Sequence, residues 1–222
     1  MGIASMFEFR KDVWQRSEMA EAGPLAGKVL TEIVSGLVAG TKVATQIGWR
    51  DVAGVAVGDK VLTFDGGMRT VASIDRQIIA TMGEYTHCNA WPLLVPTEAL
   101  GNRDPMIILP QQSIMIESDA AEEVFDDPFA MIPALALEGF RGIKRVPPAT
   151  QIEIVTLVFA QDEVVFCDIG ALIFCPWSYD LIAAGLSVYS TLSMDVANAL
   201  VMVMELDGMG EVCIQPPHQY AA

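Results

Sequence analysis

The densest group of ionisable side chains in the sequence is an acidic run between residues 117 and 127. Its members are Glu117, Asp119, Glu122, Glu123, Asp126 and Asp127. Such carboxylates would hold Ca²⁺ if several oxygens converged at about 2.3–2.6 Å, but the residue order and the glycine of an EF-hand loop are missing. The same spacing suits a solvated helix face, which would attract a basic partner. We therefore predict a binding surface for a basic protein or a cation here, and no resident metal or cofactor.

Two other places carry side chains that could act as nucleophiles. Ser35 precedes Gly36, and its hydroxyl would be weak without an adjacent base. His87 and Cys88 are adjacent in sequence, so on a strand their side chains would point apart. No third group is evident that would orient such a pair. We expect Ser35 to turn or cap the chain, and the His87–Cys88 segment to be a loop beside Trp91.

The elements that would position these residues are mostly short strands. Asp65-Gly66-Gly67 predicts a tight hairpin that joins a strand at 61–64 to a returning strand at 69–74. Gln161-Asp162 predicts a second hairpin between strands at 151–159 and 163–166. Further strands are expected at 41–45, 93–95, 106–109 and 114–116, with a turn at 48–50. Short strands at close spacing indicate a mainly β barrel-like or sandwich core.

Helices are expected at the edges of this β domain. An insert near 119–139 predicts helices over 119–125 and 129–137, the second ending at Gly139. A last helix begins after Ser193, with Val196, Leu200 and Val203 on its apolar face, and ends at Gly208. A short helix over 25–34 also has apolar residues at helical spacing. These signals divide the chain into an N-terminal tail (1–24), a β domain (25–190), and a C-terminal helix and tail (191–222).

The composition limits the classes of function. The 222 residues carry 13 Lys and Arg against 28 Asp and Glu, a formal charge of −15, so phosphates would be repelled and nucleic-acid binding is not expected. The most apolar stretch, 181–206, is interrupted by charged and amide residues, so we predict no membrane span. No signal peptide is evident over 1–16, which favours a cytoplasmic location and leaves non-classical export open. We expect the cysteines to be free, mostly buried thiols. They are Cys88, Cys167, Cys175 and Cys213.

A first group of segments comprises Ala39-Gly40-Thr41-Lys42-Val43-Ala44-Thr45, Gly48-Trp49-Arg50 and Val57-Gly58-Asp59-Lys60-Val61-Leu62-Thr63-Phe64-Asp65. This group resembles the opening block of bacterial Hint domains, the hedgehog/intein family, and further segments resemble later parts of the same family. The others, in the family's order, are Ile108-Leu109-Pro110-Gln111-Gln112-Ser113-Ile114-Met115-Ile116 and the late segment from Ile152 to Phe166. The resemblance implies a Hint-like, pseudo-twofold fold of curved β-hairpins with peripheral helices. It extends from about residue 36 to residue 166.

The resemblance also implies a chemistry, an N–S or N–O acyl shift that cleaves the chain. A Cys or Ser at the start of the opening block attacks the preceding carbonyl carbon, and a His protonates the leaving amine. The family's Cys stands four positions before Gly40, where this sequence has Gly36. Gln112, Thr156 and Asp162 stand where the family has His. The C-terminal His-Asn pair of inteins is also absent, since Gln219 follows His218.

These replacements lead to three hypotheses about function. The first is a degenerate Hint domain that lacks self-cleavage and acts as a protein-interaction or assembly module. The second is residual autoprocessing near Ser35-Gly36. The third is a cation- or ligand-binding domain that uses the acidic run. Removing one member of an acyl-transfer site typically lowers the rate by several orders of magnitude, which favours the first hypothesis.

Overall fold

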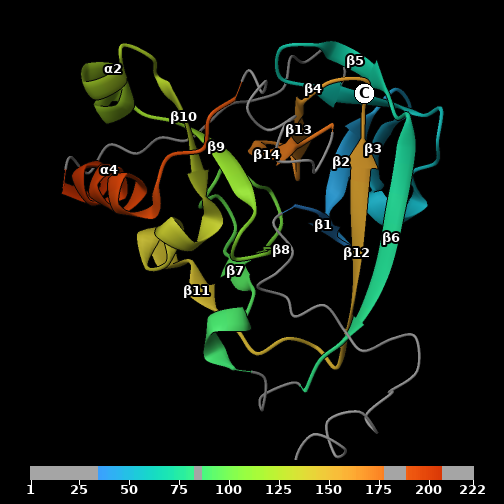
Figure 1. Ribbon diagram of the computed structural model, residues 1–222, viewed down its shortest axis with the longest axis horizontal. Coiled ribbons are helices and arrows are strands. Elements are labelled where there is room, and N and C mark those ends of the chain that lie inside the picture. The colour runs from blue at the N-terminus through green and yellow to red at the C-terminus, as the bar shows by residue number, and fades with distance from the viewer. Residues whose placement is uncertain (1–34, 83–86, 178–188, 207–222) are drawn as a thin grey trace, which may run out of the picture.

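The chain is mainly β in the computed structural model, which describes residues 35–82, 87–177 and 189–206. Figure 1 shows the strands gathered in the centre, with two α-helices on one flank. These are α2 (Asp119–Phe125) and α4 (Met194–Leu206). The strands are β1 (Leu37–Val38), β2 (Lys42–Thr45), β3 (Gly48–Asp51), β4 (Lys60–Thr63), β5 (Gly67–Thr70), β6 (Ser73–Ala80), β7 (Leu93–Val95), β8 (Met106–Ile108), β9 (Ser113–Glu117), β10 (Phe129–Pro133), β11 (Lys144–Arg145), β12 (Gln151–Val158), β13 (Glu163–Cys167) and β14 (Ala171–Cys175). Single 3₁₀ turns lie at η2 (Val52–Gly54), η4 (Cys88–Ala90), η5 (Ala134–Leu137) and η6 (Phe140–Gly142).

Three antiparallel sheets make up the domain. The largest has eight strands, in the order β10-β9-β14-β13-β2-β4-β5, with β3 paired to β2. A second sheet is a ribbon in which β12 lies between β1 and β6, and a third joins β11, β7 and β8. Mainly β architecture with helices at the edge confirms the fold class expected from the sequence.

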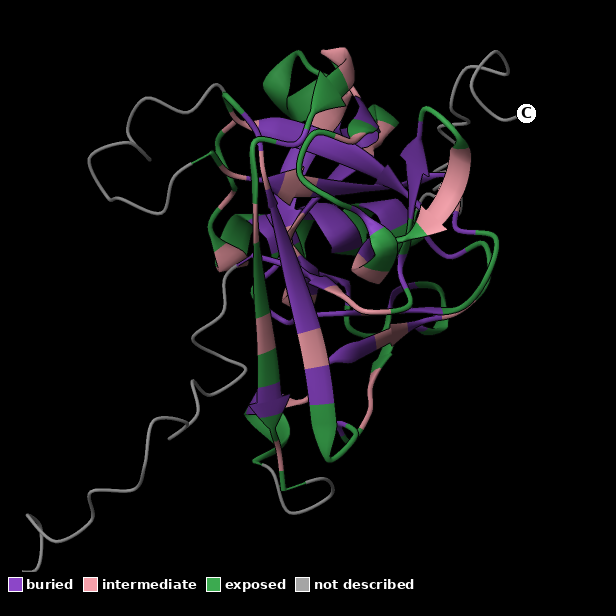
Figure 2. Cartoon of the chain, turned by 90° about the vertical axis from the view of Figure 1, so that its right-hand side faces the viewer, coloured by how far each residue is buried: buried purple, intermediate pink, exposed green. Residues whose placement is uncertain are grey.

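The early hairpin was predicted correctly, whereas the late one was wrong. β4 pairs with β5 around Gly66-Gly67. Residues 151–158 and 163–167 do form strands, but β12 pairs with β6 along eight positions and β13 pairs with β14. The physical reason is non-local: β12 finds a long partner in β6, which itself begins at Ser73 within the stretch expected to belong to the first hairpin. Figure 2 shows this long pair, buried more fully along β12 than along β6.

Residues 48–50 were expected to turn the chain, and instead they belong to strand β3. The turn lies one step earlier, at Gln46-Ile47, and Gly48 takes a positive φ of 101° at the start of the strand. β3 then returns along β2 with four paired positions. Gly48 therefore closes the β2–β3 hairpin and does not belong to a separate loop.

The helical insert was predicted correctly only in its first half. α2 covers Asp119–Phe125, as expected, and ends at Asp126, which takes a left-handed conformation with φ 58°. Residues 129–133, expected to be helical, form β10, which pairs with β9 at five positions. Pairing with a neighbouring strand outweighs the local apolar spacing, and only one 3₁₀ turn, η5, follows.

The C-terminal helix is confirmed, but its buried face differs from the expectation. Ala197, Leu200, Val201 and Met204 are buried, whereas Val196 and Val203 are exposed. Of the three residues expected on the apolar face, only Leu200 faces the core. The expected helix over 25–34, the tail over 1–24 and the expected helix end at Gly208 lie outside the described residues.

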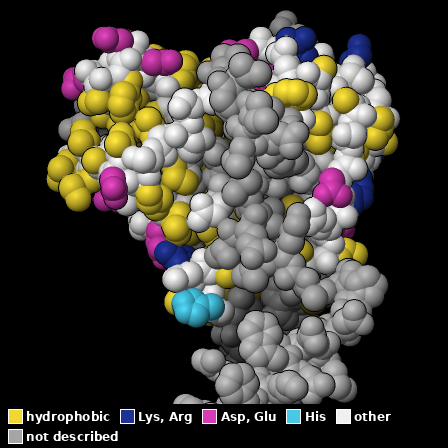
Figure 3. All heavy atoms as spheres, in the orientation of Figure 1, with side chains coloured by type: hydrophobic (Ala, Val, Ile, Leu, Met, Phe, Trp, Pro, Cys, Tyr) yellow, Lys and Arg dark blue, Asp and Glu magenta, His cyan; other side chains and the backbone are white. Residues whose placement is uncertain are grey.

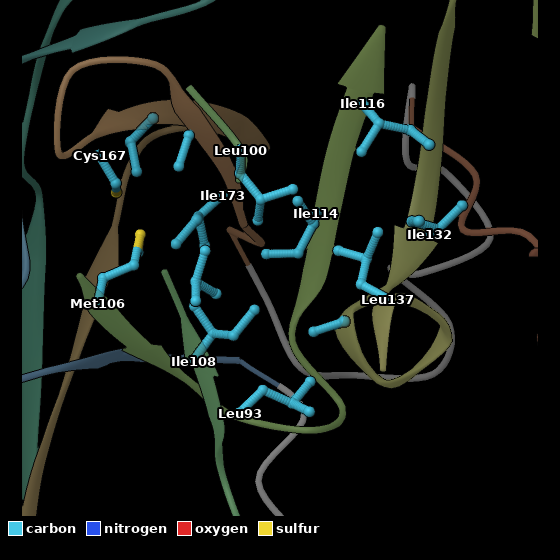
Figure 4. Packing of buried hydrophobic residues seen from close by; sticks show 14 of the residues in the cluster. Leu93, Leu100, Met106, Ile108, Ile114, Ile116, Ile132, Leu137, Cys167 and Ile173 are labelled. Carbon is cyan, nitrogen blue, oxygen red and sulfur yellow. The ribbon is translucent and has the colours of Figure 1, made fainter. Parts of the chain in front are cut away.

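The large sheet has hydrophobic core on both of its faces, and its central strand β13 is therefore buried along its whole length. Val165 and Cys167 belong to the main cluster, and Val164 and Phe166 to a second cluster on the opposite face. Alternate residues of a strand point to opposite faces, which gives this split. Figure 4 shows how side chains from β7, β8, β9, β10 and β14 fill the main cluster.

Candidate functional site

The two positions expected to correspond to nucleophile and His are in direct contact. Gly36 N–H donates a hydrogen bond to Gln112 Oε1 at 2.8 Å, and the contact is buried. The Gln112 side chain is only 1% exposed, and its Nε2 donates to the carbonyl oxygen of Phe174 at 2.8 Å. Gln112 therefore ties the strand start at Gly36 to β14.

Thr156 completes this cluster, which we call the Gly36 site and define as Gly36, Gln112, Ile154 and Thr156. The register of β1 on β12 pairs Leu37 with Val155, which places Gly36 beside Thr156. A Cβ atom at position 36 would lie 3.2 Å from Thr156 Oγ1 and 2.4 Å from Ile154 Cγ2. Gly36 also has φ +144°, where side chains are strained. The side chains of the Gly36 site therefore leave no room for a Cβ atom at position 36.

Asp162, the fourth position, is held at a different place. It lies in the turn between β12 and β13, and its Oδ1 accepts a hydrogen bond from Trp177 N–H at 2.8 Å. This hydrogen bond ties Asp162 to residue 177, beyond the end of β14, rather than to the Gly36 site. Three of the four positions implied by the resemblance are therefore brought together.

Ser35 is buried, with 5% of its surface exposed, next to Gly36. Its Oγ has no hydrogen-bond partner among the described residues. A buried hydroxyl without a partner destabilises the fold by about 1–3 kcal/mol. The expected turning or capping role is therefore not provided by a hydrogen bond within the described part of the chain.

Two of the described cysteines have thiols that burial makes hard to ionise, and Cys213 lies outside the described residues. Cys167 and Cys175 are fully buried and free. Burial raises the pKa of the Cys175 thiol to about 12, and it raises the pKa of Cys167 well above its usual value. Cys88 is exposed in η4, where His87 Nδ1 accepts a hydrogen bond from the Asn89 backbone N–H. This ring nitrogen caps the turn and does not contact the thiol.

The acidic run lies on and beside α2. Glu117 is half-buried at the end of β9, while the others are exposed. Asp119 and Glu122 occupy the first turn of the helix, where their negative charge interacts favourably with the helix dipole. Asp127 Oδ1 accepts a hydrogen bond from Phe129 N–H at 2.9 Å, which fixes the entry to β10. Among the described residues no three His, Cys, Asp or Glu side chains converge as a metal site would require.

Sequence reasoning did not find a polar pocket of about 310 Å³ around Asp168, which we call the Asp168 pocket. It is lined by Lys42, Trp49, Arg103, Asp104, Asp168 and Ile169. Burial raises the pKa of the Asp168 carboxyl to about 6, although the Lys42 backbone N–H donates to its Oδ2 at 3.3 Å. Lys42 Nζ pairs with Asp104 Oδ2 at 2.6 Å across the rim. Perturbed acids in pockets are frequent at functional sites.

Backbone strain marks the same pocket. Asp168 and Ile169 have φ values of 43° and 89°, and the second is unusual for a β-branched residue. The turn is held by Gly170, whose Cβ position lies 2.6 Å from the carbonyl oxygen of Gly101, so only glycine fits. The sequence did carry a signal, since Asp168-Ile169-Gly170 separates two apolar strands and predicts a turn with a carboxylate.

A larger pocket of about 690 Å³ lies between β4, β9, β10 and residues 189–192. Its lining is mostly apolar and comprises Phe64, Asp65, Met115, Phe125, Asp127, Phe129, Ala130, Met131, Tyr189, Ser190 and Leu192. Phe64 and Phe129 meet edge to face at 4.8 Å. The Tyr189 hydroxyl donates a hydrogen bond to Asp65, which with burial raises the pKa of this tyrosine. The described helices include none long and apolar enough to cross a membrane.

Comparisons with known proteins identify the family of this chain. No curated protein matches the chain. Among solved structures, the GSH linked, splice inactive variant of the AceL NrdHF class 3 split intein is similar, with 15% identity, a TM-score of 0.37, and coverage of 64% of this chain and 97% of that one. The family model described as "Hint domain" matches residues 35–171, which is more than half of the chain and includes the whole Gly36 site. This protein therefore belongs to the Hint domain family.

Proposed function

We propose that this Hint domain is a non-catalytic protein-interaction module that has kept the scaffold and lost self-cleavage. The observation that carries the proposal is the packing at position 36. An acyl shift requires a nucleophilic side chain there, and the chain has a glycine whose Cβ position is already filled by Ile154 Cγ2 at 2.4 Å.

The proton carrier is replaced in the same way. Proton transfer at neutral pH requires a group that titrates near 7, such as imidazole. Gln112 is an amide, and its oxygen and nitrogen are both engaged, with Gly36 N–H and with the carbonyl oxygens of Phe174 and Ser113. This network holds two strands together, which is a structural use of the position.

The buried thiols do not offer a substitute nucleophile. A thiol reacts as the thiolate, and burial raises the pKa of Cys167 and Cys175 far above neutrality. Cys88 is exposed, and the imidazole next to it is used by Asn89 N–H. These contacts support the proposed loss of self-cleavage.

Intact-mass spectrometry of the purified full chain tests the loss of self-cleavage. The chain is incubated for days at pH 6, 7 and 8, with and without dithiothreitol and hydroxylamine. The expected result is the mass of the 222-residue chain under every condition. Fragments that meet near residue 35 would overturn the proposal. The interaction part is tested separately, by pull-down from the native cell extract followed by reconstitution with the purified partner.

Residual autoprocessing at Ser35 is the second candidate, favoured by one observation. The Ser35 hydroxyl is buried and lacks a hydrogen-bond partner among the described residues. In this reaction Ser35 Oγ attacks the carbonyl carbon of residue 34, the C–N bond breaks, and the hydroxyl proton passes to the new amine. The absence of a described base beside Oγ argues against a useful rate.

Hydroxylamine distinguishes this candidate sharply. It would cleave the ester to give a hydroxamate at residue 34 and a free amine at Ser35, hence two fragments of defined mass. Ser35→Ala is the matched control, because it removes only the hydroxyl. Fragments from the wild-type chain that disappear in Ser35→Ala would establish autoprocessing, and their absence from both chains would exclude it.

A cation- or ligand-binding role for the acidic run gains no support from the geometry. Asp119, Glu122 and Glu123 are exposed, and within the described residues they are not gathered with other ligands around one point. The run is better explained as a charged surface beside α2 and α4.

A further inference from the structure

One side of the two-helix flank is apolar and open to solvent. We call it the α2/α4 face and define it as Val124, Phe125, Val196, Met202, Val203 and Leu206. Their exposed fractions range from 39% at Phe125 to 79% at Leu206. Figure 3 shows hydrophobic side chains gathered over this flank, with acidic side chains around them.

The exposed apolar residues of α4 are not needed to pack this helix on its own domain. Ala197, Leu200, Val201 and Met204 already anchor the helix to the core, where it lies against η5 and β10. The opposite side of a surface helix is normally polar. In α4 that side instead carries large apolar residues, and exposed apolar patches of this kind mark interaction sites.

The spacing on α4 identifies the shape of the partner. Val196, Ala199, Val203 and Leu206 are exposed and follow one another at intervals of three, four and three residues. This is the spacing of the a and d positions along a helix that packs against another helix. Helix α2 contacts α4, and its Val124 and Phe125 are also exposed apolar residues on this flank.

Charge identifies the chemistry of the partner. Residues 117–139 and 189–206 contain no Lys, Arg or His. They contain nine carboxylates, Glu117, Asp119, Glu122, Glu123, Asp126, Asp127, Glu138, Asp195 and Glu205. Glu138 pairs with Arg145, and within the described residues none of the other eight has an ion pair. A second copy of the chain docked through this face would bring like charges together, which disfavours a symmetric dimer.

We propose that the α2/α4 face binds a basic amphipathic helix of another protein, whose apolar stripe lies along α4 and whose Lys and Arg side chains reach the surrounding carboxylates. This inference rests on the proposed interaction function and names its surface and partner class. The mode is that of an amphipathic helix laid on an apolar surface. Charge would set the rate of encounter, and the apolar stripe would set the lifetime of the complex.

The test uses the full chain and a fluorescently labelled model peptide of Leu and Lys, about 18 residues long, with leucines at three- and four-residue intervals. Fluorescence anisotropy at 50 mM and 150 mM salt gives the affinity. The expected results are saturable binding by the wild-type chain, and an affinity at least about tenfold lower for Val203→Glu, since a carboxylate would be buried against leucines. Ile78→Glu is the matched control, at an exposed apolar site on β6, and should bind as the wild type does.

Further arms separate the alternatives. A peptide of the same composition with its leucines scrambled should bind at least about tenfold more weakly, because it lacks the apolar stripe. Equal binding of both peptides, or equal binding by Val203→Glu, would mean attraction by charge alone and would overturn the inference. A wild-type dimer that Val203→Glu dissociates in sedimentation, or binding to phosphatidylcholine vesicles, would overturn it too. Because these results do not depend on cleavage, failure here leaves the intact-mass test of the proposed function unaffected.

Discussion

Gly36 and Gln112 are joined by a hydrogen bond of 2.8 Å between residues 76 positions apart in sequence. The bond lies in the interior, where Gln112 Nε2 also binds Phe174 O. One side chain thereby satisfies backbone groups of two segments that are distant from it in sequence. An amide is well suited to this role because it donates and accepts at the same time. The position that the family resemblance assigns to a proton-transferring His therefore holds an amide that links distant segments of the fold.

Gln112→Ala should destabilise the fold by about 2–4 kcal/mol, because it leaves Gly36 N–H and Phe174 O without partners and opens a cavity. Urea unfolding followed by fluorescence gives the change in free energy. Gln111→Ala is the matched control, since Gln111 is exposed and should alter stability by less than about 0.5 kcal/mol. Equal effects at the two positions would contradict the structural role.

Gly36→Ala should be more harmful than Gly40→Ala by at least about 1 kcal/mol, because a Cβ at position 36 overpacks the interior. Both glycines have positive φ, of 144° and 101°, so both variants incur backbone strain. A Cβ at Gly40 meets nothing within 4 Å, whereas at Gly36 it meets Ile154 at 2.4 Å. The difference between their unfolding free energies therefore isolates the packing. If Gly36→Ala is as harmful in an Ile154→Ala background, which lacks Cγ2, as it is in the wild type, the assigned clash is wrong.

Asp168→Asn should stabilise the protein most at pH 8, and the gain should shrink steadily as the pH falls from about 6 to about 4. Burial raises the pKa of Asp168 from 3.8 to about 6, so between these values the folded state binds more protons than the unfolded state. Stability from this group is therefore lost as pH rises through about 6. Asparagine tolerates the left-handed backbone at this position. Melting temperatures from pH 4.5 to 8 should diverge by an amount equivalent to about 1–3 kcal/mol. A difference that does not change with pH would refute this account.

Thiol labelling should separate the described cysteines into two classes. In the native chain Cys88 should react with N-ethylmaleimide within minutes, while Cys167 and Cys175 should be protected until the protein unfolds. Peptide mapping by mass spectrometry assigns the modified residue. Full labelling in urea is the control for reactivity. Native modification of Cys167 at the rate of Cys88 would contradict the burial of β13.

The sequence predicted elements better than it predicted their partners. The hairpin at Gly66-Gly67 and helix α2 depend on local signals, a turn glycine and acidic residues in a first helical turn, and both are present. β10 was taken for a helix because its apolar residues allow either assignment, and only pairing with β9 decides between them. The pairing of β12 with β6 depends on residues more than 70 positions apart, which no local pattern encodes.

At the candidate site too, the residues were easier to predict from the sequence than their contacts with distant residues. Gly36, Gln112 and Thr156 were identified through family resemblance, and the structure places Gln112 and Thr156 next to Gly36. The role of Ile154 in filling position 36 was missed, because a strand valine or isoleucine gives no sign of which glycine it will face. Asp168 was missed because its burial depends on the approach of Gly101 and Lys42 from other segments.

The central place of β12 has a consequence during synthesis on the ribosome. β1 and β6 pair with β12, which is synthesised much later, so these two early strands emerge long before their partner exists. With β6 ending at Ala80 and β12 beginning at Gln151, that delay is about 4–14 seconds at 5–20 residues per second. A nascent chain of this protein therefore exposes open strand edges for seconds, a period in which chaperones rather than native contacts must prevent aggregation.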